Sequence, residues 1–360
     1  MIAALAVIAA LSFADSAALS VTFTATGGTV TARGLYTAGG TAGAFRVIVT
    51  YGTIADTSVV RVGSVGPPAS TAPPTSAAPA PAPTRASAGA RAAAGVPFGV
   101  FNVMPGAVTM PFDLSVVAGD PGALLGQLAT AQANGTRVVV NFAGGKYSRN
   151  YGIDGYFSFD VWKSRVDRFR GVDLAPYIAD GTLFANYLID EPHHGASWGG
   201  RAVAFETLER MAQYSKSIWP GLMTITRTRV SWLHRAPFRW EHLDAGWAQY
   251  AVVRGEIQKY RAVEVAAAKA SGLGLLFGLN STNGGAVVSG CHPGSREGEC
   301  AMTAEELLRF GRVLAADPSS CGLTFWQYDA AYFGRDDIRA SLAELAALNR
   351  VHAPTDCRGG

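Results

Sequence analysis

The amino-acid sequence predicts an α/β protein in which residues 96–360 form a TIM-like (β/α)8 barrel, preceded by a small β module and a linker. Apolar, β-favouring runs alternate with helical patterns in this region, as expected for a parallel sheet with helical crossovers. The runs are apolar along their whole length, which is typical of strands buried on both faces. The sequence has no glycine-rich phosphate loop, and this favours a closed barrel over an open nucleotide-binding sheet.

The chain opens with an apolar stretch over residues 1–18 that lacks basic residues and ends in small ones. We interpret it either as an unusual signal peptide or as the ragged start of a truncated domain. Residues 19–63 then alternate polar and apolar residues between glycine turns, which predicts several short antiparallel strands. Within them, residues 24–30 and 34–47 resemble the C-terminal half of bacterial Ig-like domains. We expect a partial Ig-like module that acts as a spacer or adhesion element.

Residues 64–95 are rich in proline, alanine, serine and threonine. Such a composition favours extended polyproline geometry, and a segment of this length can span up to ~100 Å. We therefore assign it as a linker between the β module and the barrel.

The barrel region divides into strand-like and helix-like segments. We expect strands at residues 98–104, 137–142, 183–189, 222–228, 245–250, 273–279 and 323–328. We expect helices at residues 122–133, 161–169, 201–218, 255–270, 304–315 and 337–348, with Thr303 and Glu306 forming a capping box. An eighth strand is missing from this assignment, and residues 146–159 either contain an irregular strand or form a long active-site loop.

Four cysteines lie in the last quarter of the chain. Cys291 and Cys300 bracket a polar loop that a local disulfide would close. Cys321 precedes a strand and Cys357 follows the last helix, and in a (β/α) barrel both positions lie at the same face. We therefore predict the pairs 291–300 and 321–357 and an oxidising compartment. The alternative is four free thiols in a cytosolic protein.

The segment that organises the barrel is Thr182–His194, in which a strand-like run ends in Asp190, Glu191 and Pro192. Proline cannot donate to a ladder and restricts the residue before it, so the acids must follow the strand. The carboxyl ends of barrel strands carry the chemistry in this fold. Asp190-Glu191-Pro192 resembles the acid-bearing strand end of (β/α)8 glycoside hydrolases. Neighbouring Asp and Glu residues also resemble the hexosaminidase pattern, in which Asp steers a substrate acetamido group.

This resemblance implies that Glu191 is the general acid/base, and we expect burial among aromatic side chains to raise its pKa. Glycoside cleavage needs a second carboxylate. We rank Asp329 above Asp190 for this role, because strand alternation points either Asp190 or Glu191 outward unless the backbone bends. Related barrels often place a nucleophilic Glu on the penultimate strand end. Here residues 279–283 contain no acid, which leaves an inverting route, substrate assistance or no hydrolysis.

Polar and aromatic side chains gather at the predicted strand ends and in the loops that follow them. Amides and arginines there could bind sugar hydroxyls, carboxylates or sulfates, and aromatic rings could stack on sugar faces. The predicted substrate-binding residues are Asn102, Asn141, Tyr187, His193, Trp198, Arg227, Arg229, Gln249, Asn280, Trp326 and Tyr328.

Composition excludes several other functions. The net charge is only +3 and no basic stripe is present, so we expect no nucleic-acid partner. After the opening stretch, the sequence contains no run of eighteen uncharged apolar residues, so we expect no membrane span. His193 and His194 lack further metal ligands nearby in sequence, and we expect no metal and no cofactor. The pattern Gly195-Ala-Ser197-Trp-Gly199 fits a serine-esterase motif, but it does not directly follow a strand as that motif requires.

The sequence thus favours a monomeric glycosidase, secreted or on the bacterial cell surface, that acts on a polysaccharide or glycan, with Glu191, Asp190 and Asp329 as candidate catalytic residues. A non-catalytic glycan-binding or surface-adhesion protein on the same barrel is the alternative. A serine esterase that uses Ser197 is a third class.

Overall fold

The computed structural model describes residues 21–32, 36–51, 54–62, 95–103, 111–144 and 152–358. The chain divides into two units, residues 1–84 and 85–360, which we treat separately. The predicted signal segment over residues 1–18 and all but the last residue of the predicted linker lie outside the described residues. None of the helices in the described parts of the chain is long and apolar enough to cross a membrane.

In the first unit, the described residues form a three-stranded antiparallel sheet and a two-stranded ribbon. The sheet has the order β1-β4-β5, with β1 Val21–Ala25, β4 Gly43–Tyr51 and β5 Ile54–Val62. The ribbon pairs β2 Thr29–Val30 with β3 Tyr36–Thr37. These short antiparallel strands agree with the alternating sequence pattern, while the Ig-like assignment stays a prediction.

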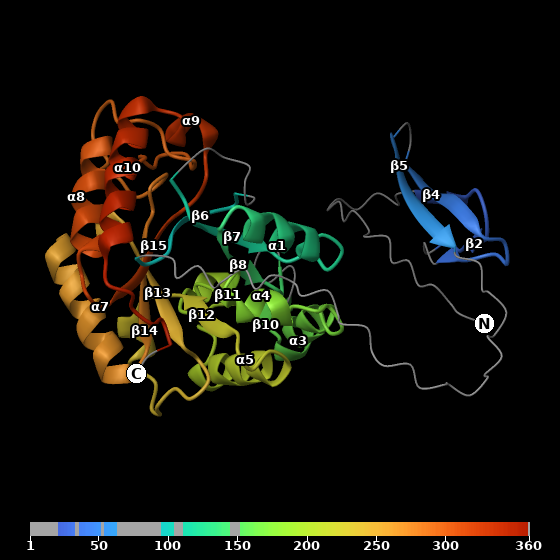
Figure 1. The fold of residues 1–360 in the computed structure, drawn as a ribbon, viewed down its shortest axis with the longest axis horizontal. Helices are drawn as coiled ribbons and strands as arrows, with labels where there is room; N and C mark the ends of the chain where they lie inside the picture. Colours follow the sequence, from blue (N-terminus) through green and yellow to red (C-terminus); the bar gives the residue numbers. More distant parts are fainter. Residues whose placement is uncertain are drawn as a thin grey trace, which may run out of the picture. The chain divides into compact units, whose positions relative to one another are not determined.

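The second unit is a closed barrel of eight parallel strands, in the order β11-β12-β13-β14-β15-β6-β7-β8 (Figure 1). The strands are β6 Phe98–Phe101, β7 Leu114–Ala118, β8 Arg137–Asn141, β11 Leu183–Asp190, β12 Met223–Arg227, β13 Ala245–Tyr250, β14 Gly274–Leu279 and β15 Ser320–Phe325. The closed barrel predicted from the sequence is confirmed.

Helices surround the barrel, and most follow the predicted segments. They are α1 Leu124–Ala133, α3 Phe159–Asp167, α4 Ala175–Ala179, α5 Phe205–Ile218, α6 Val230–Leu233, α7 Ile257–Ser271, α8 Ala304–Ala315, α9 Ala330–Phe333 and α10 Asp336–Val351. Figure 1 shows α7, α8 and α10 side by side outside β13, β14 and β15. The predicted capping box is confirmed, since Thr303 and Glu306 each accept a hydrogen bond from the other's backbone N–H at the start of α8.

The eighth strand is β7, which the sequence analysis missed. Its five residues are flanked by Asp113 and Gly119, and so short an apolar run gives no periodicity that separates a strand from a buried loop. Of the predicted segment 146–159, residues 146–151 lie outside the described residues. In its described part, β9 Gly152–Ile153 and β10 Tyr156–Phe157 pair with each other as a separate two-stranded sheet.

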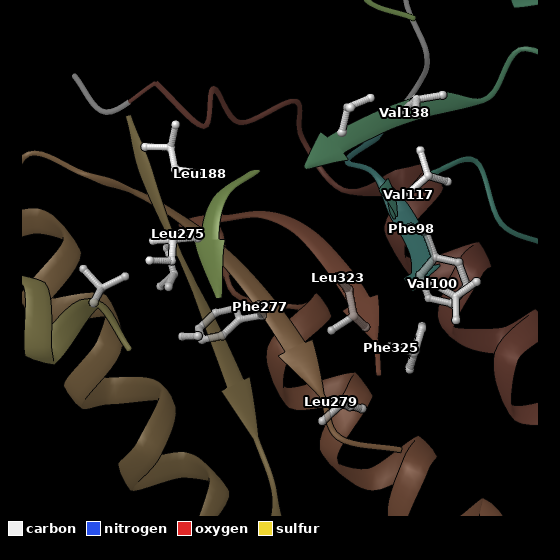
Figure 2. Close-up of a cluster of buried hydrophobic side chains, with 14 of the residues drawn as sticks. Phe98, Val100, Val117, Val138, Leu188, Leu275, Phe277, Leu279, Leu323 and Phe325 are labelled. Carbon is white, nitrogen blue, oxygen red and sulfur yellow. The ribbon is translucent and has the colours of Figure 1, made fainter. Parts of the chain in front are cut away.

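Two layers of apolar side chains hold the barrel together. The outer layer lies between strands and helices, and Figure 2 shows part of it, including Val138, Phe277 and Phe325. The inner layer fills the barrel with residues such as Leu114, Ile225 and Leu276. Each strand is therefore buried on both faces, which explains the uniformly apolar runs in the sequence.

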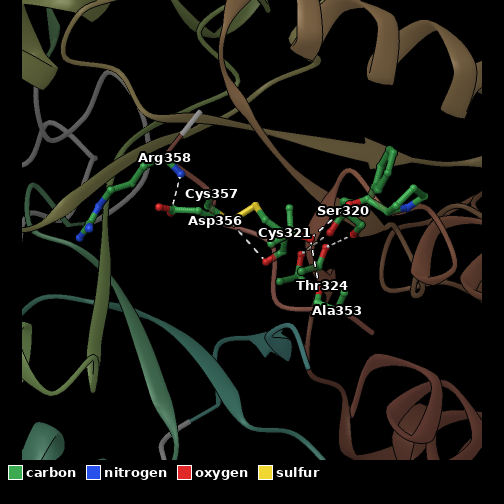
Figure 3. Close-up of a disulfide and its surroundings, with 11 residues drawn as sticks. Ser320, Cys321, Thr324, Ala353, Asp356, Cys357 and Arg358 are labelled. Carbon is green, nitrogen blue, oxygen red and sulfur yellow. Dashed lines mark hydrogen bonds between the residues drawn. A yellow bond between two sulfur atoms is a disulfide. The ribbon is translucent and has the colours of Figure 1, made fainter. Parts of the chain in front are cut away.

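Both predicted disulfides are confirmed. Cys321, in β15, and Cys357, which follows α10, are buried in the inner layer and join the C-terminal segment to the barrel (Figure 3). This segment also lines a small cavity with residues at or near the amino-terminal ends of β6, β8, β11 and β12. A Cβ on Gly274 would lie 2.1 Å from the Cys357 carbonyl oxygen, so only glycine permits this approach. Residues 354–358 thus cover the end of the barrel at which the strands begin.

We predict that the Cys321–Cys357 bridge contributes more to stability than the Cys291–Cys300 bridge. The first closes a separation of 36 residues and the second a separation of 9. Loop-closure entropy then gives about 4 kcal/mol for the first and about 2.5 kcal/mol for the second. The check is chemical unfolding of Cys321→Ala/Cys357→Ala beside Cys291→Ala/Cys300→Ala. Equal losses, or a larger loss for the short loop, would contradict this ranking.

Candidate functional site

The predicted acids lie where β11 leaves the barrel. Asp190 is the last residue of β11 and pairs with Arg227, the last residue of β12, and the register shifts between Tyr187 and Asp190. Glu191 has φ +40°, and its N–H donates to the Arg227 carbonyl at 3.0 Å. The backbone therefore bends at Glu191. This bend lets two neighbouring carboxylates face the same partner, which regular strand alternation would prevent.

That partner is Arg227, whose side chain is only 8% exposed. Its Nε donates to Asp190 and its Nη1 donates to the side-chain oxygen of Gln249. Its Nη2 lies 3.6 Å from the carboxylate of Glu191. Burial acts to lower the pKa of Arg227, but the charge of Asp190 and the neighbouring Tyr187 outweighs it and raises that pKa well above its ordinary value. Arg227 is therefore a permanent buried cation between two acids.

A cavity of about 410 Å³ opens beside this cluster. Among the residues that the structure describes, five that line it are apolar or aromatic and seven are polar. They are Phe101, Val117, Ala118, Tyr187 and Trp326, and Asn102, Asn141, Asp190, Asn283, Ser295, Arg296 and Gln327. The cavity combines an aromatic wall with several amides and two charged side chains.

Trp326 connects the cavity to the charged cluster. The Arg227 guanidinium lies 4.7 Å from the centre of its ring, and the Phe101 ring contacts it edge-on at 4.8 Å. Three hydrogen bonds reach its carbonyl oxygen from the chain that follows β14: the hydroxyls of Ser281 and Thr282 at 2.9 and 3.2 Å, and the Thr282 N–H at 3.2 Å. The Trp326 backbone and one ring face are thus fixed by neighbouring strands.

Two of the predicted amides also lie in the cavity wall. The Asn102 side chain donates to Gln327 at 2.9 Å, which ties the end of β6 to the segment after β15. The Asn141 side-chain oxygen accepts from the Gly144 N–H at 2.8 Å. Each contact fixes the orientation of an amide and leaves its remaining polar groups for a ligand.

The structure brings together most, but not all, of the predicted residues. Tyr187 is one that lies in the cluster. Burial and then the charge of Asp190 raise the pKa of Tyr187 well above its ordinary value, so this hydroxyl stays protonated beside the acids. Trp198 is 1% exposed, and its indole N–H donates to the Glu191 carbonyl at 3.1 Å. This hydrogen bond holds the backbone at the bend that carries the two acids. Asn280 follows β14 and donates its N–H to the Tyr250 carbonyl.

The segment after β15 differs from the prediction. The sequence predicts a strand over residues 323–328, but the regular strand ends at Phe325, so Trp326 and Tyr328 lie beyond it. Tyr328 stacks on Phe333 with ring centres 5.7 Å apart. Asp329 is the N-cap residue of α9, and its carboxylate accepts from the Tyr332 N–H at 2.8 Å. The Asp329 carboxylate is engaged as a helix cap, whereas Asp190 is the acid that joins Glu191 at Arg227.

Two histidines follow the acids. His193 Nδ1 lies 2.8 Å from the Thr228 hydroxyl. Burial, followed by the charges of Arg229 and Arg254, lowers the pKa of His193 to about 4. His194 Nδ1 lies 3.0 Å from the Ser197 hydroxyl. These two share one exposed turn, so their contact is local and lacks the strand-to-helix turn of a serine esterase. No group of three potential metal ligands occurs among residues whose placement is described.

The sequence analysis did not select Ser295, Arg296 or Asn283 as site residues. They belong to the loop between β14 and α8, and Ser295 and Arg296 lie within the ring that Cys291 and Cys300 close. A disulfide-closed loop that follows a barrel strand was the signal that could have identified them, because such loops lie at the face that carries the chemistry.

No protein-family model matches this chain, and no curated protein matches it in sequence. Among solved structures, it is similar to a β-glucanase from Saccharophagus degradans, with 10% identity, TM-score 0.48 and coverage of 67% of this chain and 79% of that one. It is also similar to an endo-β-1,4-mannanase from Cellulomonas fimi, with 12% identity, TM-score 0.46 and coverage of 74% and 75%. A GH30 endoxylanase from Clostridium papyrosolvens matches with 8% identity, TM-score 0.43 and coverage of 72% and 74%.

These neighbours are glycoside hydrolases. The barrel itself is assigned from the strand order of this chain.

We predict that His193 remains neutral down to about pH 4 in the folded protein, below its ordinary value of 6.5. Because the unfolded chain binds this proton more readily, folding stability falls as the pH drops from 6.5 toward 4. The measurement is NMR titration of the imidazole signals, with His193→Gln to assign the resonance. Arg229→Gln should raise the pKa of His193, since one neighbouring positive charge is removed. An unchanged titration in that variant would show that Arg229 does not act on His193.

Proposed function

We propose that this protein is a secreted glycosidase that hydrolyses a glycosidic bond in a polysaccharide or glycan. The observation that carries the proposal is the convergence of Asp190 and Glu191 on one buried guanidinium beside the cavity. Two carboxylates in different environments are what glycoside hydrolysis requires.

The cavity supports a sugar as the ligand. Its volume of about 410 Å³ falls within the range of small-molecule sites. Asn102, Asn141 and Gln327 offer amide donors and acceptors that match sugar hydroxyls. The half-buried ring of Trp326 offers an apolar face for a pyranose ring.

The contacts of the two acids suggest their roles. Asp190 accepts a hydrogen bond from Arg227 and is 15% exposed, so it is the acid that this cation holds more closely. Glu191 lies further from the guanidinium, at 3.6 Å, and is 30% exposed. We therefore assign Glu191 as the group that gives its proton to the glycosidic oxygen as the C–O bond breaks.

Asp190 then serves the other half of the reaction. In an inverting reaction, Asp190 is the base that takes a proton from the water that attacks the anomeric carbon. With a 2-acetamido sugar, Asp190 instead accepts a hydrogen bond from the amide N–H, and the carbonyl oxygen of that acetamido group attacks the anomeric carbon. Both roles avoid a protein nucleophile on β14. This agrees with the end of that strand, where Asn280, Ser281 and Thr282 replace an acid.

Secretion is supported by the two disulfides, because structural disulfides form and persist in oxidising compartments. In this proposal the linker over residues 64–95 separates the barrel from the N-terminal β module, which acts as a spacer or adhesion element.

The test is a screen of the full chain against neutral, acidic and N-acetylated oligosaccharides, with Glu191→Gln and Asp190→Asn alongside. We expect Glu191→Gln to lower kcat by about 100- to 10,000-fold, the usual contribution of a positioned proton donor. A kcat that survives this substitution would remove Glu191 from the mechanism.

Asp329→Asn serves as the matched control. If Asp329 only caps α9, this variant keeps most of its activity. A loss as large as that of Asp190→Asn would instead make Asp329 the second catalytic carboxylate. A wild-type chain that binds sugars through the cavity and hydrolyses none of them would indicate the alternative, a non-catalytic glycan-binding protein.

A further inference from the structure

The loop between β14 and α8 is fixed rigidly against the barrel. Besides the Cys291–Cys300 disulfide, Gly294 donates its N–H to the Glu299 carbonyl at 2.7 Å, and Ala301 donates to the His292 carbonyl at 3.1 Å. Gly285 donates to the Cys300 carbonyl at 3.0 Å. A covalent bridge and three backbone hydrogen bonds therefore define the shape of this ring.

The tip of the ring is attached to the segment that follows β14. The Asn283 side-chain oxygen accepts from the Ser295 hydroxyl at 2.9 Å and from the Arg296 N–H at 3.1 Å. Ser295 donates its own N–H to the Thr282 carbonyl at 3.2 Å. A Cβ on Gly294 would lie 2.7 Å from that same carbonyl oxygen. The backbone is packed too closely here for any other residue, so Ser295 and Arg296 are held at the cavity wall.

The charges in the cavity are not equivalent. Two described lining residues carry charge, Asp190 and Arg296. Asp190 is hydrogen-bonded to Arg227. Arg296 is 65% exposed, and its ion pair with Glu299 of the same ring is loose, with 3.8 Å between Nη1 and Oε1. A ligand in the cavity can replace this pair easily, because exposed ion pairs contribute little.

We propose that the Cys291–Cys300 ring is a specificity element, in which Arg296 binds a carboxylate or sulfate group of an acidic glycan. The planar guanidinium matches such an anion with two parallel N–H donors. Ser295 and the amide of Asn283 lie beside it. This inference rests on the proposed function, since it names the class of glycan that the same cavity accepts.

The experiment is calorimetric binding to the full chain carrying Glu191→Gln, so that no substrate is consumed. The probes are an oligogalacturonate, a sulfated carrageenan oligosaccharide and a neutral xylo-oligosaccharide of the same length. We expect at least one acidic probe to bind about tenfold more tightly than the neutral one, the lower range for a charged hydrogen bond at an exposed site. The preferred acidic probe distinguishes carboxylate from sulfate.

Arg296→Gln should remove this preference and leave binding of the neutral probe unchanged. Arg339→Gln is the matched control, because Arg339 is an exposed arginine on α10. It should keep the preference. The pair Cys291→Ser/Cys300→Ser should lose most of the preference as well, because the ring no longer fixes Arg296.

The outcomes separate this inference from the proposed function. Equal binding of acidic and neutral probes, or a preference that survives Arg296→Gln, would overturn the role of Arg296 while the sugar site stands. Failure of all three probes to bind would count against the sugar site itself and the inference together.

Discussion

The arrangement of side chains at the carboxyl ends of the barrel strands depends on one buried cation. Arg227 is the last residue of β12, and its side chain is 8% exposed. It contacts Asp190 at the end of β11 and Glu191 in the turn that follows. It also contacts Gln249 on β13 and the ring of Trp326, which follows β15. A charge in such a position is tolerated only when its partners satisfy it, and the loss of one partner leaves another charge uncompensated. The geometry of the acids, Gln249 and Trp326 is therefore a single arrangement and not four separate ones.

The rest of the fold leaves this face free for chemistry. The inner apolar layer fills the barrel and the outer one lies between strands and helices. The Cys321–Cys357 bridge joins the C-terminal segment to the barrel near the amino-terminal ends of the strands. The second disulfide instead shapes a wall of the cavity. The Cys321–Cys357 bridge and the candidate site thus lie at opposite ends of the strands.

Features set by local chemistry could be predicted from the sequence. Pro192 fixed where β11 ends, the uniformly apolar runs indicated a closed parallel barrel, and the capping box and both disulfides followed from spacing and position. Features set by long-range packing could not. The five residues of β7 carry no periodicity, and the bend at Glu191 arises from pairing with β12. Arg296 is placed at the cavity by a hydrogen bond from its backbone N–H to Asn283. Likewise, only the structure shows that Tyr328 packs on Phe333 and that Trp198 lies behind the acids.

The most direct test of this account is a double-mutant cycle between Asp190 and Arg227 in the full chain, measured by chemical unfolding. Asp190→Asn and Arg227→Met each remove one partner of the buried pair, and each should cost about 3 kcal/mol or more. The combined variant leaves neither charge of the pair unmatched, so we predict that it costs less than the sum by at least about 2 kcal/mol. Losses that add within about 0.5 kcal/mol would show that the two side chains act independently, and would contradict the central role given to Arg227.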